Sequence, residues 1–167
     1  MRRWQKLVLQ ASRGRWLRLL ALALFLVPWP AQASDLAGWE KDSPYQRLYK
    51  PAEVDKIKVT VVRRQEVVPI PGMAPGLALV VTEGGEATFL VHLGPKSYLD
   101  RQPLAVAPGD TVKIRGVWAE IGGQEVFMAA KIKKDDGYQY KLRLTSDGRP
   151  FWSLSPEERA REAAAAD

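Results

Sequence analysis

TVKIRGVWAEIGGQEVFMAAKIK, residues 111–133, carries the clearest structural pattern in this chain. Apolar and polar residues alternate on both sides of Gly122-Gly123, and a period of two residues is typical of a half-buried β-strand. Paired glycines accept the positive φ angles of a tight hairpin turn. We therefore expect strands at 111–119 and 125–133, with the following residues on their inner faces: Val112, Ile114, Trp118, Val126, Met128, Ala130 and Ile132.

The same alternation continues on both sides of this hairpin. Further strands are predicted at 57–68, 77–82, 87–93 and 138–144, separated by turns that contain Gly or Pro, with a short helical turn at 97–101. A small OB-like β-barrel has this order of elements: three strands, a helical connection and two or three more strands. Closure of the barrel removes exposed strand edges. The sequence thus predicts an all-β, OB-like barrel of five to six strands, with an open β-sandwich as the alternative.

We place the β domain at 56–152. The segments on either side of it lack the alternation of a β-strand. Residues 34–55 are polar, contain Pro44 and Pro51, and read as an ordered N-terminal arm. Residues 153–167 form a polar C-terminal helix or tail. Its start is marked by Ser155-Pro156 followed by Glu158, the pattern of a capping box with proline in the first turn.

Residues 1–33 have the pattern of a secretory signal peptide. A basic segment precedes the apolar run 19–27, and small residues follow at Ala31 and Ala33. We expect cleavage between Ala33 and Ser34 and a periplasmic protein. A retained N-terminal membrane anchor is the alternative, although the apolar run is shorter than the roughly 20 residues that span a bilayer.

The positive net charge of +6 comes from this leader. Six of the 25 basic residues lie within its first 18 positions, and the remaining 19 are balanced by 19 acidic residues. The chain has no cysteine, which excludes thiolate catalysis, cysteine-ligated zinc, iron–sulfur clusters and covalent c-type haem. No cofactor is predicted.

Basic residues alternate with core positions on the last three predicted strands. A surface of this kind suits an anionic ligand, a lipid headgroup or an acidic partner, and the alternative is an ordinary solvated face. The candidate residues are Lys113, Arg115, Lys131, Lys133, Lys141 and Arg143.

His92, the single histidine, lies beside a predicted corner at Gly94-Pro95. An imidazole can act as a pH switch or as a metal or haem ligand, and the alternative is a hydrogen bond to the nearby loop backbone. Tyr98 and Trp118 could stack nucleic-acid bases, as aromatic residues do in OB-folds. Export and the neutral charge of the mature chain argue against nucleic acid. No catalytic triad, paired carboxylates or metal-ligand cluster is evident, so no enzyme is expected.

Four segments together resemble the magnetosome-associated MamS/MamX-type domain family. They are residues 43–49 (SPYQRLY), 91–95 (VHLGP), 108–110 (PGD) and 147–152 (DGRPFW). The resemblance implies an exported bacterial domain with an OB-like β fold. Some family members carry c-type haem motifs, which this chain lacks, and no catalytic residue of the family can be transferred to it.

These observations predict a non-enzymatic periplasmic binding or accessory domain. Its expected partner is a periplasmic or membrane-associated protein, and a membrane or a cytochrome redox complex is one candidate setting. The alternative is a small-ligand or metal carrier that uses His92 and Gly94-Pro95.

Overall fold

A computed structural model describes residues 34–85, 87–134 and 137–165; the predicted signal peptide lies outside them. The strands are β1 (Asp55–Val67), β2 (Gly76–Thr82), β3 (Thr88–Pro95), β4 (Thr111–Ile121), β5 (Gln124–Lys134) and β6 (Gln139–Lys141). The helices are α1 (Lys96–Leu99) and α2 (Pro156–Ala164), and short 3-10 helices lie at Gln46–Leu48, Pro51–Glu53 and Phe151–Ser153.

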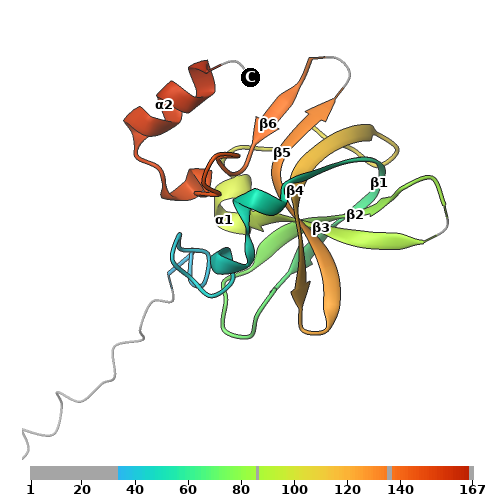
Figure 1. The fold of residues 1–167 in the computed structure, drawn as a ribbon, viewed down its shortest axis with the longest axis horizontal. Coiled ribbons are helices and arrows are strands. Elements are labelled where there is room, and N and C mark those ends of the chain that lie inside the picture. Colours follow the sequence, from blue (N-terminus) through green and yellow to red (C-terminus); the bar gives the residue numbers. More distant parts are fainter. Residues whose placement is uncertain (1–33, 86, 135–136, 166–167) are drawn as a thin grey trace, which may run out of the picture. The chain divides into compact units, whose positions relative to one another are not determined.

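The six strands form one sheet in the order β3-β2-β1-β4-β5-β6 (Figure 1). Neighbours in this order are antiparallel, and an additional parallel pairing joins β3 to β5 at His92 and Met128. Strands β1 to β5 therefore form a closed circuit of hydrogen-bonded pairs, which is how a barrel removes its edges. The predicted mainly β fold with an OB-like strand order is confirmed.

Two predicted element boundaries differ from the structure. β3 continues through Gly94 to Pro95, so this pair belongs to a strand and not to a corner. β6 ends at Lys141, because the N–H groups of Leu142 and Arg143 both donate to the carbonyl of Ala130, at 2.7 and 3.0 Å. This shared acceptor interrupts the regular ladder, so a strand through residue 144 was a wrong expectation.

An irregularity in the β4–β5 pairing changes which β5 residues face the barrel interior. Arg115 pairs with Lys131, but Gly116 pairs with Ala129, so Ala130 is an extra residue on β5. A one-residue insertion reverses the alternation beyond it. Phe127 therefore shares the inner face with its partner Trp118. The prediction that Val126, Met128 and Ala130 continue the inner face of Ile132 is wrong for this reason.

The arm and the C-terminal segment pack on each other and on the barrel through aromatic rings. Trp39 contacts Tyr45 and Trp152 with ring centroids at 4.8 and 6.0 Å. The indole N–H of Trp152 donates to the carbonyl of Trp39 at 2.7 Å, and that of Trp39 donates to Ala74 at 2.8 Å. Aromatic side chains bury large areas when they pack, so these contacts fix both ends of the domain.

Helix α2 begins where the sequence predicted. The Ser155 hydroxyl accepts the N–H of Glu158 at 3.2 Å, and the Glu158 carboxylate accepts the N–H of Ser155 at 2.9 Å. Two donors that the first turn of a helix leaves unpaired are satisfied in this way. The predicted capping box is confirmed.

Replacement of Gly116 by alanine should destabilise the barrel. A Cβ atom at this position would lie 2.2 Å from the carbonyl oxygen of Met128, so β4 and β5 would have to separate. We expect a loss of about 1–3 kcal/mol in the free energy of unfolding, measured by urea denaturation. Gly85→Ala is the control, because no atom lies within 4 Å of its added Cβ. Equal stabilities for the two variants would contradict this role of Gly116.

Candidate functional site

Basic residues from four strands are direct cross-strand neighbours. Residues opposite each other in a ladder share a face, with their Cβ atoms about 4.5–5.5 Å apart. The register forms two rows, Lys56–Arg115–Lys131–Lys141 and Lys58–Lys113–Lys133. Like charges directly opposite one another destabilise a sheet. The rows thus contain five neighbouring pairs that oppose folding.

Five of these cations form what we call the basic face. They are Lys56, Lys58, Lys113, Arg115 and Lys133 on β1, β4 and β5. All are exposed except the half-buried Lys113. Within residues 34–85, 87–134 and 137–165, Lys56, Lys58, Arg115 and Lys133 form no ion pair. These four cations are therefore available to an external anion.

The two β1 members of the basic face were not among the candidates chosen from sequence. Lys56 and Lys58 alternate with the core residues Ile57 and Val59, which is the same signal that identified Lys113 and Arg115. Alternation alone does not show that β1 lies beside β4. The strand pairing supplies this information.

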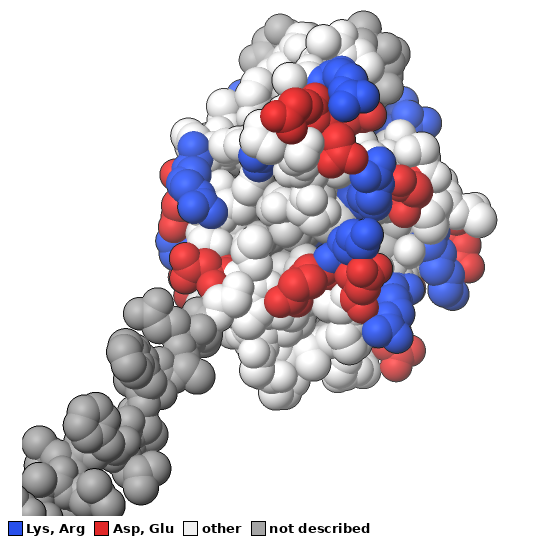
Figure 2. Space-filling model, turned by 90° about the vertical axis from the view of Figure 1, so that its left-hand side faces the viewer, with Lys and Arg blue, Asp and Glu red and all other residues white. Residues whose placement is uncertain are grey.

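The side of the domain that carries the arm and α2 has a different charge distribution. Figure 2 looks onto this side and shows acidic and basic side chains interspersed, with uncharged surface between them. One group there is the guanidinium of Arg149, which pairs with Asp147 at 2.7 Å and with Glu158 at 3.0 Å. Charges on this side are partly paired, whereas Lys58, Arg115 and Lys133 form no ion pair within the described residues.

Lys131 and Lys141 lie at the end of their row, where α2 covers it. The Lys141 ammonium donates to the carbonyls of Glu162 and Ala165, at 2.6 and 2.9 Å. Lys131 is only 2% exposed. Burial, with Lys133, Lys141 and Arg115 nearby, lowers the pKa of Lys131 to about 8. Neither of these two predicted site residues therefore belongs to the open basic face.

Arg143 was expected on the outer surface and is instead 1% exposed. Its Nη1 donates to the carbonyls of Ala129 and Leu93, at 2.5 and 3.3 Å. The guanidinium carbon lies 5.7 Å from the ring centre of Tyr49 and 5.1 Å from that of Trp152. The end of β6 at Lys141 explains the difference, because the chain no longer follows the alternation of that strand.

His92 is buried beneath the arm at 3% exposure. Its Nδ1 shares a hydrogen bond of 3.3 Å with the Tyr45 hydroxyl, rather than with loop backbone. Burial, with a further contribution from the charge of Arg143, lowers the pKa of His92 to about 4. The imidazole is therefore neutral near pH 7.

The other predicted residues near His92 are also covered. A Cβ atom at Gly94 would lie 2.5 Å from the Trp152 ring, and Pro95 is buried. Tyr98 is 4% exposed and its hydroxyl donates to Gln102 at 3.2 Å. Trp118 packs between Phe89 and Phe127 with centroids about 5 Å away. Tyr98 is therefore covered, and Trp118 is half-buried between two rings.

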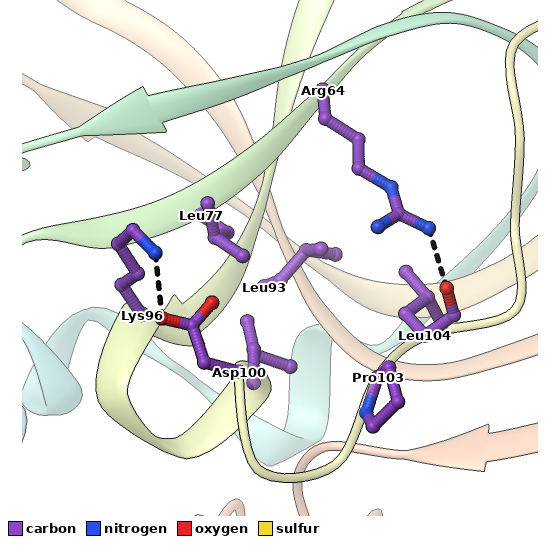
Figure 3. Close-up of a pocket in the computed structure, with 8 residues that line it drawn as sticks. Arg64, Leu77, Leu93, Lys96, Asp100, Pro103 and Leu104 are labelled. Carbon is purple, nitrogen blue, oxygen red and sulfur yellow. Dashed lines mark hydrogen bonds and ion pairs between the residues drawn. The ribbon is translucent and has the colours of Figure 1, made fainter.

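A cleft of about 430 Å³ lies at the α1 end of the barrel (Figure 3). Leu77 and Leu93 line its floor, with Arg64 on one side and Lys96 with Asp100 on the other. The polar groups are engaged with neighbours: the Lys96 ammonium contacts Asp100 at 2.6 Å, and Arg64 Nη2 donates to Leu104 at 2.5 Å. The cleft thus offers mainly apolar surface.

Two further findings concern metals and membranes. No group of three or more His, Asp or Glu residues is placed to hold a metal ion in the described segments 34–85, 87–134 and 137–165. Across the same segments, no helix combines the length and the apolar character needed to span a bilayer.

Comparison with known proteins identifies one family. The model of the MamS/MamX magnetosome protein family matches residues 53–138, which extend from the end of the arm to the start of β6. No curated protein is detectably similar to the chain. Among solved structures, the PriB protein of Ralstonia solanacearum aligns with 21% identity and a TM-score of 0.36, over 50% of this chain and 97% of that one.

Acidification should destabilise the domain through His92. An unfolded histidine binds its proton near pH 6.5, whereas the pKa of buried His92 is about 4. The unfolded state therefore takes up the proton first, and stability is lost as the pH falls from 6.5 to 4. The pKa difference corresponds to a loss of about 3 kcal/mol. Urea denaturation across this window measures it. His92→Gln should flatten the pH dependence, and an unchanged dependence in that variant would contradict the assignment.

Proposed function

Because this chain belongs to the MamS/MamX magnetosome protein family and carries a basic face, we propose that it is a non-enzymatic accessory domain that binds an acidic partner protein. The signal-peptide pattern supports a periplasmic or membrane-associated partner. Burial of His92 under the arm supports a binding role over a catalytic one.

The observation that carries this proposal is the register of like charges on β1, β4 and β5. Like charges directly opposite one another destabilise a sheet, so the arrangement opposes the stability of the domain. A role in binding would explain why the sheet carries charges that destabilise it. Carboxylates of a partner placed over both rows would neutralise the repulsion and form charge-assisted hydrogen bonds.

The dimensions of the basic face favour a macromolecular partner. Adjacent strands lie about 4.8 Å apart and alternate residues on a strand about 7 Å apart, so three strands present a charged area roughly 10 Å wide. Several acidic side chains are needed to cover it. Complementary charge of this kind accelerates association and selects the partner.

The basic face can be tested by charge reversal with a matched control. The test variant is Lys58→Glu/Lys133→Glu, and the control is Lys41→Glu/Arg101→Glu, which changes the net charge equally at exposed positions outside the face. Residues 34–167, tagged at the C-terminus, are used to isolate a partner from the native envelope fraction. The partner is identified, purified and titrated against all three proteins.

We expect the test variant to bind the purified partner at least tenfold more weakly, and the control to bind within about twofold of wild type. Higher salt should weaken wild-type binding, because it screens exposed charges. Equal affinities for the two double variants would contradict the proposal. So would binding of the wild type to anionic lipid vesicles without any acidic protein partner.

A further inference from the structure

We propose that a small oxyanion of the phosphate type binds in a cavity between the end of the barrel sheet and α2, with the Arg143 guanidinium as its principal ligand. The cavity has a volume of about 180 Å³. Among its lining residues are Lys131, Lys141, Arg143, Thr145, Ser146 and Glu162. No residue of the basic face lines it, so this site is separate from the proposed partner surface.

The first observation is an incompletely bonded cation. Arg143 is 1% exposed, and its Nη2 makes no hydrogen bond to the described residues 34–85, 87–134 and 137–165. A buried donor without a partner costs about 1–3 kcal/mol, and more when it is charged. An anion in the cavity that Arg143 lines would supply the missing acceptor.

The second observation is the absence of a counter-ion for Arg143 within the described part of the chain. The groups that bond to it are neutral: the Ala129 and Leu93 carbonyls, the Gln46 side-chain oxygen at 3.5 Å, and the Tyr45 hydroxyl, whose pKa burial raises to about 12. None of the ion pairs among these residues involves Arg143. Burying a charge is expensive unless it is paired. A guanidinium held by neutral groups, without a carboxylate partner among the described residues, therefore favours an anionic ligand.

The third observation is that two lysines converge on the same cavity. Lys131 is 2% exposed, and Lys141 is its cross-strand neighbour. Burial, followed by repulsion from Lys133, Lys141 and Arg115, lowers the pKa of Lys131 to about 8. A bound anion would relieve this repulsion and hold Lys131 in its charged form.

The size and polarity of the cavity indicate the class of anion. Its volume of about 180 Å³ is large enough to admit a tetrahedral oxyanion. Guanidinium groups match the geometry of phosphate oxygens, and the hydroxyls of Thr145 and Ser146 are further donors. A larger ligand could place a phosphoryl group there.

Helix α2 forms one side of the cavity and contributes an opposing charge. Lys141 holds the helix by its last carbonyls, an arrangement that the helix dipole favours. The Glu162 carboxylate also lines the cavity and should weaken anion binding. Neutral substitutions of Lys141 and Glu162 should therefore change the affinity for an anion in opposite directions.

The test is calorimetric titration of residues 34–167 with inorganic phosphate at pH 7 in low-chloride buffer. Lys141→Gln should weaken binding about tenfold, and Glu162→Gln should strengthen it severalfold. Lys41→Gln is the control, because it removes the same charge from an exposed position that belongs neither to the basic face nor to the cavity. Its affinity should stay within about twofold of wild type.

Two additions complete the test. Arg143→Lys keeps the positive charge but removes the planar guanidinium, whose N–H groups can bind two phosphate oxygens at once. It should weaken phosphate binding at least tenfold in protein shown by circular dichroism to be folded. Tighter binding of glycerol 3-phosphate than of phosphate would identify a phosphoryl group on a larger ligand, and the reverse would identify the free anion. Absence of binding at 10 mM phosphate, or equal weakening by Lys41→Gln and Lys141→Gln, would overturn the proposal.

Discussion

The buried guanidinium of Arg143 is the interaction on which the arrangement of this domain depends. It bonds to backbone carbonyls of β3 and β5, lies near Gln46 of the arm, and packs between Tyr49 and Trp152. Arm, barrel and C-terminal segment therefore meet at one charged group. A lost contact in any of the three would leave a cation buried without compensation, which is among the most destabilising changes in a protein.

This packing divides the positive charges of the barrel into two groups with different surroundings. Lys131 and Lys141 lie under α2, whereas the basic face remains open to solvent. The covered group is suited to a small ion that compensates buried charge. The open group is suited to a protein surface, because its charges are spread over three strands. Both groups of positive charges result from the same strand register. The repulsion within each group destabilises the sheet, and a bound anion would reduce that repulsion.

Alternation around Gly122-Gly123 was sufficient to predict the central hairpin and the OB-like order, because a half-buried strand imposes that pattern directly. The features that could not be predicted depend on contacts distant in sequence. The extra residue at Ala130 reverses one face of β5, and Gln46 lies 97 positions before Arg143. The position of β1 beside β4, which brings Lys58 next to Lys113, is likewise a property of the assembled barrel.

Native-state hydrogen exchange measures most directly whether Arg143 joins these three parts into one cooperative unit. The informative amides are those of Tyr49 and Phe151, which donate to the carbonyls of Gln46 and Leu142 at 3.1 and 3.0 Å. If the account is right, their protection will lie within about tenfold of that of the β4 and β5 amides in the barrel core. Exchange at Tyr49 and Phe151 a hundredfold or more faster, with the barrel still protected, would contradict it.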